Sequence, residues 1–428
     1  MLRSHRCHGL FNCPQTQVSL ILALEVKPKL AEWHLITCEY PPKIGGVSDY
    51  TFVMAKELTK AGDTVHVWCG PAAGETPQSP GVTVHRDLGG FAPSDLRRAG
   101  KLLDEFPVPR RLFVQWVPHG YGYRSMNLFF CVWLWWRARR RRDQVEIMFH
   151  EVWLAFGGNW KSNIAAAVHR IMVMFLKHAA SRIWISGEAW RKSLRGVRAP
   201  IAWLPVPSNV PSNACPTQVA AVREQYKLVG GQLVGHFGIG NTYVESLLRA
   251  FVPSLLRERS DVSFLLIGKG GEKFAQEMQQ AHPDISQRIF ATGLLPPSEI
   301  SASISACDLL VQPYADGIST RRTAAMAVLA NGRALLTTSG HSTEPFWLDC
   351  DHWAIVPASD TGALVVRARQ ILDDKPECER MARAGKRIYD ALFDVSLSVQ
   401  VLRGAREPWN SELVRRLSGA ESVTAVSG

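Results

Sequence analysis

Short runs of apolar residues alternate along the chain with longer stretches in which apolar residues recur at helical spacing. The first run, Trp33 to Cys38, is followed by prolines, a pair of glycines and a segment with one apolar helical face; a second run spans Thr64 to Cys69. Two buried strands joined by one helix run parallel, because only a crossover connection of this length brings them side by side. The pattern therefore predicts βα units and a parallel sheet.

The pattern breaks once and then restarts. Residues 205–216 contain four prolines separated by polar residues, which is typical of a linker. We therefore predict an α/β protein with two doubly wound, Rossmann-like domains that face each other across a cleft. The predicted divisions are a disordered leader at 1–30, an N-terminal domain at 31–205, a linker at 206–217, a C-terminal domain at 218–395, a closing helix at 396–418 and a frayed tail at 419–428.

Glycines follow the first predicted strand of each domain. They are Gly45 and Gly46 in the first half, and Gly238 and Gly240 in the second. In doubly wound sheets, ligands bind beyond the carboxyl ends of the strands, where such turns leave backbone N–H groups exposed. Neither turn has the spacing of a dinucleotide fingerprint. The two turns together predict a cleft with backbone donors on both walls.

A strand at 308–312 runs into the segment from Pro313 to Arg322, and a helix is predicted at 323–330. The helix is expected to end at the left-handed cap signal Asn331-Gly332 and to begin at Ser319 or Thr320 as N-cap.

Two arginines, Arg321 and Arg322, lie at the start of this helix. A helix N-terminus and forked guanidinium donors suit an anion such as a diphosphate. The alternative is an ordinary capped helix with two solvated arginines.

Composition narrows the choice of partners. The 428 residues are 46% hydrophobic and 20% charged, and 49 Lys and Arg against 38 Asp and Glu give a formal charge of +11. This balance favours anionic partners, such as nucleotides or a membrane surface, and the chain carries no recognised nucleic-acid module. The 9 cysteines form no CxxC pair, which favours a reducing, cytoplasmic compartment.

An aromatic run continues into arginines at residues 126–142. One interpretation is a core helix whose basic end matches the helix dipole. The other is an interfacial helix that places its aromatic side chains in an anionic membrane and its arginines on the head groups.

The motifs resemble those of retaining glycosyltransferases of family 4, over roughly residues 33–405. The resemblance rests on these segments: Glu39-Tyr40-Pro41-Pro42, Gly45-Gly46-Val47, Val65-His66-Val67, Leu265-Leu266-Ile267-Gly268, Ala291-Thr292-Gly293, Ala306 to Pro313, Met326-Ala327 and Asn331-Gly332. It implies the GT-B architecture, with a nucleotide-sugar held mainly by the C-terminal domain and no metal ion or other cofactor.

The resemblance also implies roles for single residues. The family's strand-end histidine, close to the reacting sugar, matches His150, with His119 and Glu151 as weaker candidates on the acceptor side. The family's two motif glutamates fall on Asp316, a shorter carboxylate, and on Ala324, which has none.

The Arg and Lys that the family carries after the first C-terminal strand are absent. We expect Arg321 and Arg322, with Lys269 behind them and the N–H groups near Ser319, to take their place at the diphosphate. Gly45 and Gly46 are expected to contact the diphosphate from the N-terminal domain, and Gly238 and Gly240 to border the donor.

The resemblance therefore implies a glycosyltransferase that moves a sugar from a nucleoside-diphosphate sugar to a glycan or lipid-linked acceptor with retention. Two alternatives stay open: a catalytically degenerate relative that binds sugar nucleotides or serves as an assembly subunit, and a sugar-nucleotide epimerase. We expect a cytoplasmic protein, peripheral to the membrane if residues 126–142 dock there.

Overall fold

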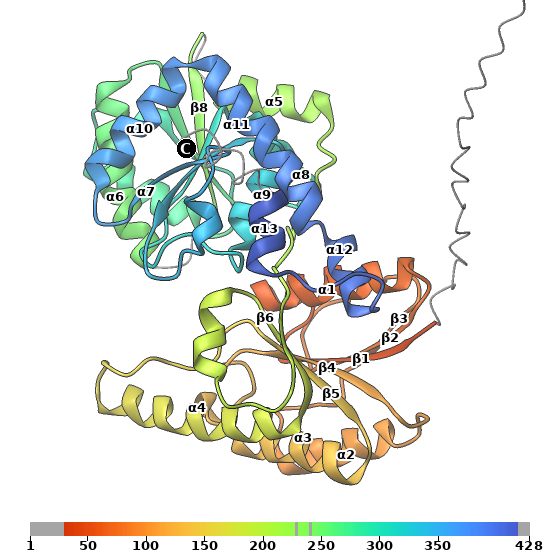
Figure 1. Cartoon of the computed structure of the whole chain (residues 1–428). Coiled ribbons are helices and arrows are strands. Elements are labelled where there is room, and N and C mark those ends of the chain that lie inside the picture. Colours follow the sequence, from red (N-terminus) through yellow and green to blue (C-terminus); the bar gives the residue numbers. More distant parts are fainter. Residues whose placement is uncertain (1–29, 227–229, 239–241, 418–428) are drawn as a thin grey trace, which may run out of the picture.

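The structure, a computed structural model, describes residues 30–226, 230–238 and 242–417. The chain forms two α/β domains that lie one above the other in Figure 1, with the C-terminal domain at the top. The predicted fold class is thus confirmed. The predicted leader and tail, apart from Leu30, lie outside the described residues, and so does Gly240.

The N-terminal domain has a parallel sheet of seven strands in the order β3-β2-β1-β4-β5-β6-β7. Its strands are β1 (Glu32–Thr37), β2 (Thr64–Trp68), β3 (Val82–His85), β4 (Arg111–Trp116), β5 (Gln144–Phe149), β6 (Ala180–Ile185) and β7 (Ile201–Trp203). Its helices are α1 (Gly46–Lys60), α2 (Pro93–Leu103), α3 (Leu128–Arg140) and α4 (Trp160–Ala179), with 3₁₀ turns η1 (Tyr123–Ser125) and η2 (Glu188–Leu194). The central strands are buried on both faces, which explains their continuous apolar runs.

The C-terminal domain repeats the plan with six parallel strands in the order β10-β9-β8-β11-β12-β13. They are β8 (Gln232–Phe237), β9 (Val262–Ile267), β10 (Ile289–Ala291), β11 (Leu309–Gln312), β12 (Ala334–Ser339) and β13 (Ala354–Pro357). The helices are α5 (Pro216–Tyr226), α6 (Thr242–Glu258), α7 (Gly271–Ala281), α8 (Pro297–Ala306), α9 (Thr323–Ala330), α10 (Thr361–Asp373) and α11 (Lys375–Ile388), with short turns η3 (Ser286–Arg288), η4 (Pro345–Trp347) and η5 (Tyr389–Phe393).

Strand order reverses at one place in each sheet, between β1 and β4 and between β8 and β11. The two strands at such a point send their following loops in opposite directions, which opens a crevice at the carboxyl edge. The turns after β1, β4, β5 and β11 carry the predicted site residues, so both crevices belong to one interdomain cleft.

The end of the chain differs from the prediction. Instead of one closing helix at 396–418, there are two helices, α12 (Val395–Leu402) and α13 (Ser411–Leu417), separated by Gly404 with φ +72°. Helix α12 returns to the N-terminal domain, beside α1 (Figure 1). There Arg111 Nη2 donates to the carbonyl of Leu402 at 2.7 Å, and Arg403 Nη1 donates to that of Ala61 at 2.5 Å. The segment therefore ties the two domains together.

The aromatic run at 126–142 forms α3, which packs into the core through Phe130, Cys131 and Leu134. The first of its arginines, Arg137, is also buried and donates to Asp143 at 2.5 Å, which in turn accepts from Arg110 at 2.6 Å. The core interpretation is therefore correct for this face of the helix.

We expect Arg137→Ala to lower the free energy of unfolding by about 3 kcal/mol, because it breaks a buried ion pair and leaves a cavity. Arg140→Ala, at an exposed position of the same helix, should change it by no more than about 0.5 kcal/mol. Urea unfolding followed by circular dichroism measures both. Equal effects of the two substitutions would contradict the buried ion pair.

Candidate functional site

The cleft contains two adjoining hollows, each of about 400 Å³. The first lies against the N-terminal domain and is lined by Cys38, Glu39, Gly46, Val47, Val117, His119, Gly120, His150, Glu151, Val206, Arg321, Arg322 and Thr323. The second lies against the C-terminal domain and is lined by Glu151, Tyr243, Val244, Tyr314, Ala315, Asp316, Arg321, Arg322 and His341. Glu151 and the two arginines border both hollows and mark the place where the two meet.

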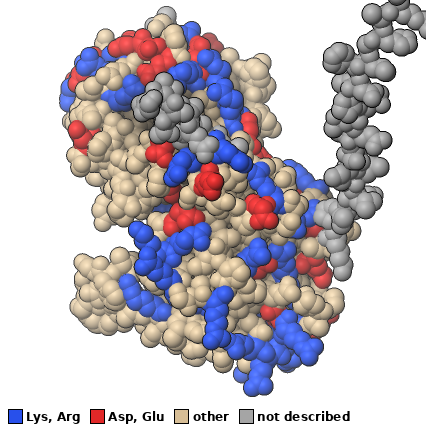
Figure 2. Space-filling model, viewed as in Figure 1, with Lys and Arg blue, Asp and Glu red and all other residues tan. Residues whose placement is uncertain are grey.

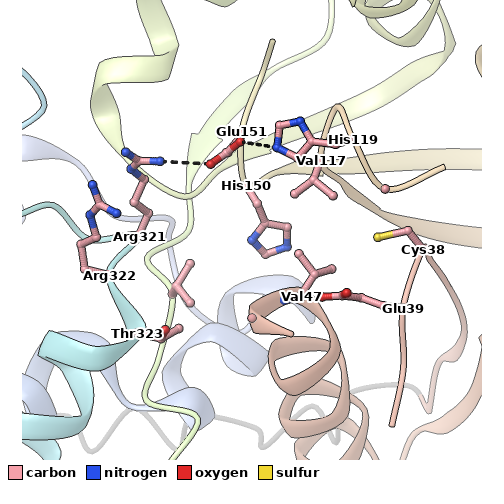
Figure 3. A pocket seen from close by; sticks show the side chains of 13 residues that line it. Cys38, Glu39, Val47, Val117, His119, His150, Glu151, Arg321, Arg322 and Thr323 are labelled. Atoms are coloured by element: carbon pink, nitrogen blue, oxygen red, sulfur yellow. Dashed lines mark hydrogen bonds and ion pairs between the residues drawn. The ribbon is translucent and has the colours of Figure 1, made fainter. Parts of the chain in front are cut away.

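A chain of charged side chains crosses the cleft (Figure 3). His119 Nε2 lies 3.2 Å from Glu151 Oε2, and Arg321 Nη1 donates to Glu151 Oε1 at 3.4 Å. The hydrogen bond with Glu151 raises the pKa of His119, and the same bond, aided by Arg321, lowers the pKa of Glu151. The predicted acceptor-side residues are therefore brought together with a predicted donor-side arginine.

Asp316 holds both arginines, one on each carboxylate oxygen. Burial raises the pKa of Asp316, but Arg322 and Arg321 outweigh that effect and keep the pKa below its ordinary value. Arg322 also stacks on the ring of Tyr314, 4.5 Å from its centroid, and its buried Nε has no hydrogen-bond partner among the described residues. Asp316 thus holds both arginines in place, and Nε of Arg322 retains donor capacity.

His150 follows β5 and packs edge-on against Tyr50, with ring centroids 4.7 Å apart. Its Nε2 lies 3.0 Å from Gln115 Oε1 and donates to that oxygen. Burial lowers the pKa of His150 to about 4, so the ring is neutral near pH 7 and its Nδ1 is left as an acceptor. In this state His150 can accept a hydrogen bond from a ligand hydroxyl in the hollow that it lines.

The first glycine turn contains a residue that sequence reasoning missed. Glu39 Oε1 accepts hydrogen bonds from the backbone N–H groups of Val47 at 3.2 Å and Ser48 at 3.1 Å, at the start of α1. A Cβ on Gly45 would lie 2.2 Å from this oxygen, so the glycine makes room for the carboxylate. A carboxylate between a strand end and a glycine pair is a signal that could have identified Glu39. The prediction that Gly45 and Gly46 contact a diphosphate stays a prediction.

The other predicted donor residues are placed less closely together. Gly238 follows β8 with φ +87°, and a Cβ built on it would lie 4.0 Å from that of Ala324. Lys269 is exposed in the turn after β9 and is not among the residues that line the two hollows. His236, near the position of the missing family cations, is buried with Nδ1 2.8 Å from the Val311 carbonyl.

The predicted N-cap of α9 is wrong. The helix begins at Thr323, and the residue before it, Arg322, makes no capping hydrogen bond. Ser319 is buried, and its hydroxyl has no partner in the part of the chain that the structure describes. Thr320 turns its hydroxyl toward the N-terminal domain instead. Tertiary contacts have thus replaced local capping. The C-terminal signal is confirmed, because Gly332 adopts φ +61° directly after the C-cap Asn331.

Comparison with known proteins agrees with this arrangement. Residues 232–374 match the sequence model of the family described as "Glycosyl transferases group 1". No curated protein matches the chain in sequence.

Solved structures share the fold over nearly the whole chain. HepE from Anabaena, in complex with UDP and glucose, has a TM-score of 0.63 at 14% identity, over 88% of this chain and 99% of HepE. Sucrose-phosphate synthase from Thermosynechococcus elongatus has a TM-score of 0.65 at 14% identity, over 92% and 100%. WaaG, a glycosyltransferase involved in lipopolysaccharide biosynthesis, has a TM-score of 0.59 at 12% identity, over 88% and 99%. The chain therefore has the GT-B fold, with a glycosyl transferases group 1 match in its C-terminal domain.

Proposed function

We propose that the protein is a glycosyltransferase that moves a sugar from a nucleoside-diphosphate sugar to an acceptor in the interdomain cleft. The observation that carries the proposal is the pair Arg321 and Arg322 at the start of α9, aimed at the junction of two hollows. A diphosphate at this junction would meet two guanidinium groups, which bind phosphate oxygens with forked hydrogen bonds. HepE, which shares the fold, has been solved with UDP-glucose.

The two hollows suit two substrates. The nucleotide-sugar would occupy the hollow lined by Tyr314, Asp316 and His341, and the acceptor the one lined by His119 and His150. The transferred sugar would then lie between them, near Glu151. We propose a glycan or lipid-linked acceptor, whose hydroxyl groups would hydrogen-bond to His119, His150 and Glu151 in the N-terminal hollow.

The reaction needs little covalent chemistry from the protein. The bond between the anomeric carbon and the diphosphate oxygen breaks, and an acceptor hydroxyl forms the new bond while its proton passes to the departing phosphate. The arginines stabilise the negative charge that grows on the leaving group. Attack on the face that the leaving group vacates gives retention, which we propose together with membership of family 4.

His150 and Asp316 have distinct roles in this proposal. Neutral His150 would accept a hydrogen bond from a sugar hydroxyl through Nδ1, and Asp316 would orient the donor sugar and both arginines. Among the described residues, no cluster of His, Cys, Asp and Glu is arranged to hold a metal ion. We propose that the arginines, rather than a metal, neutralise the diphosphate, because both lie at the junction of the two hollows.

One observation favours a second function, a sugar-nucleotide sensor or assembly subunit without turnover. Ala324 stands where the family has its second glutamate, and a Cβ built on Gly238 would lie 4.0 Å from the Cβ of Ala324. The proposal thus has a direct rival on the same fold. Binding of sugar nucleotides with slow release of free nucleotide supports the transferase, whereas binding without turnover supports the sensor.

We expect Arg321→Ala and Arg322→Ala each to weaken binding of the preferred sugar nucleotide about tenfold or more, because each removes charge-assisted hydrogen bonds. The preferred nucleotide would be found by a thermal-shift screen of UDP-, GDP- and ADP-sugars, and its affinity measured by calorimetry. Arg140→Ala is the control. An affinity that the double substitution leaves unchanged would rule out the arginines as the diphosphate site.

We also propose that the N-terminal domain docks on an anionic membrane. Helix α4, which packs beside α3, exposes Trp160, Ile164, Ile171 and Met174 along one face. Figure 2 shows Lys and Arg side chains gathered over the lower edge of this domain, near α3, and an uncharged tip at its left end. Apolar side chains beside cations suit the boundary between acyl chains and anionic head groups.

The observed geometry changes the predicted docking segment. In α3 only Phe129 and Trp136 are exposed large apolar residues, so α4 carries most of the apolar surface. Within residues 30–226, 230–238 and 242–417, no helix is long and apolar enough to span a bilayer. The proposed contact is therefore peripheral. A cytoplasmic location is proposed with it.

We expect the protein to float with vesicles that contain phosphatidylglycerol and to stay behind with neutral phosphatidylcholine vesicles. Trp160→Ser combined with Ile164→Ser should abolish flotation, since it removes two exposed apolar groups of α4. Val366→Ser is the matched control, because Val366 is an exposed apolar residue on the other domain. Flotation independent of anionic lipid would refute the proposal.

A further inference from the structure

The turn that carries the two arginines is fixed to the N-terminal domain by the residue that precedes them. Thr320 is fully buried, and its hydroxyl donates to the carbonyl of Ser186 at 2.8 Å and accepts from Trp203 Nε1 at 3.1 Å. Its carbonyl accepts from the N–H of Val206 at 3.0 Å. Ser186 directly follows β6, Trp203 ends β7 and Val206 begins the linker that leaves this sheet. The position of Arg321 across the cleft therefore depends on Thr320.

A buried carboxyl group completes this contact. Glu344, which lies before η4, is 4% exposed, and its Oε1 is 2.8 Å from Thr320 Oγ1. Its Oε2 accepts from the N–H of Thr320 at 3.1 Å and from Trp347 Nε1 at 3.0 Å. A Cβ on Gly187 would lie 3.0 Å from Oε1, so this carboxyl group also touches the N-terminal domain.

A count of hydrogen atoms shows which form of Glu344 fits. The Thr320 hydroxyl has one proton, and the Ser186 carbonyl can only accept. If the hydroxyl donates to Ser186, then the contact between Thr320 Oγ1 and Glu344 Oε1 needs a proton on Glu344. A protonated Glu344 satisfies every group: Oε1–H donates to Thr320, which also accepts from Trp203, and Oε2 accepts from Thr320 and Trp347. An ionised Glu344 would compete with Ser186 for the same proton.

The surroundings favour the same form. Burial raises the pKa of Glu344 to about 7, although the hydrogen bonds from Thr320 and Trp347 act in the opposite direction. No ion pair to Glu344 occurs in the part of the chain that the structure describes. The segments packed around it carry these charged or titratable groups: Arg321 and Arg322 next to Thr320, Glu188 after Gly187, His341 in its own loop and Asp349 after η4. Arg321 and Arg322 pair with Asp316, and Glu188 with Arg191.

We propose that Glu344 is a positioning residue that works as a neutral carboxylic acid: its proton holds Thr320 against the N-terminal domain and so sets the arginines in the cleft. The effect of this proton on protein stability does not depend on the function proposed above. The consequence for donor affinity rests on the function proposed above.

The sign of the pH dependence follows from linkage. The pKa of Glu344 is higher in the folded protein than its ordinary value of 4.5, so folding retains the proton. Its contribution to stability is therefore complete below pH 4.5 and is lost as the pH rises through about 7. An ionised Glu344 would also draw the hydroxyl proton of Thr320 away from the Ser186 carbonyl. Loss of that bond should loosen the turn that carries Arg321 and Arg322.

Glu344→Gln tests the proposal because an amide keeps the shape and supplies a permanent donor to Thr320 and an acceptor for Trp347. From pH 5 to pH 9, the Tm of the wild type should fall by about 3–6 °C relative to that of Glu344→Gln. Donor affinity should fall in parallel in the wild type and stay level in the variant. Glu379→Gln, at an exposed site, should follow the wild type. Glu344→Leu, which has no donor, should be less stable than either at every pH.

Equal pH dependence in the wild type and Glu344→Gln would overturn the proposal, and so would a Glu344→Gln variant less stable than the wild type at pH 8. Should the variants not fold, a carbon-13 titration of the Glu344 carboxyl in the wild type decides directly: a midpoint near 4.5 would refute it. Failure of the proposed function looks different, because no sugar nucleotide would then bind to any form while the Tm difference remains.

Discussion

The position of the two arginines in the cleft depends on the contact that Thr320 makes between the domains. Its hydroxyl and carbonyl bond to Ser186 and Val206, and the next residue, Arg321, reaches Glu151 on the opposite wall. An arginine that binds a ligand loses the conformational entropy of its side chain, and it loses backbone entropy as well if the backbone is mobile. A fixed backbone removes part of that cost in advance. The fold thus delivers preorganised cations rather than flexible ones.

Preorganisation also explains why the arginines form ion pairs with carboxylates of the protein. Two guanidinium groups side by side repel each other, and Asp316, with help from Glu151, compensates that repulsion. A diphosphate would then exchange with carboxylates already in place, so net affinity would be smaller than the sum of the new contacts. Such an exchange favours release of the product, which an enzyme needs and a permanent binder does not.

The features predicted correctly from the sequence are those that residues close together in the chain determine. Alternating apolar runs fixed the two parallel sheets, and Asn331-Gly332 marked the end of α9, since a left-handed cap depends on a few adjacent residues. Prediction from the sequence failed where distant residues decide. Thr320 does not cap α9 because its hydroxyl bonds to Ser186 and Glu344 instead. Arg137 is buried because it forms an ion pair with the buried Asp143. The apolar periodicity of α9 and α3 does not reveal these partners, because they lie outside these helices in the sequence.

The start of α9 shows a distant contact replacing a local one. A capping side chain would stabilise the helix by about 1 kcal/mol, yet Arg322 at the cap position bonds to Asp316 instead. The helix itself tolerates this because its residues from Ala325 to Ala330 are buried, so tertiary packing rather than capping holds it. Because α9 needs no capping side chain, its N-cap position can hold an arginine instead of the usual Ser, Thr, Asp or Asn. The missing cap and Ala324, which stands where the family that the chain resembles has a glutamate, both lie at the candidate site. At such a site function can outweigh stability.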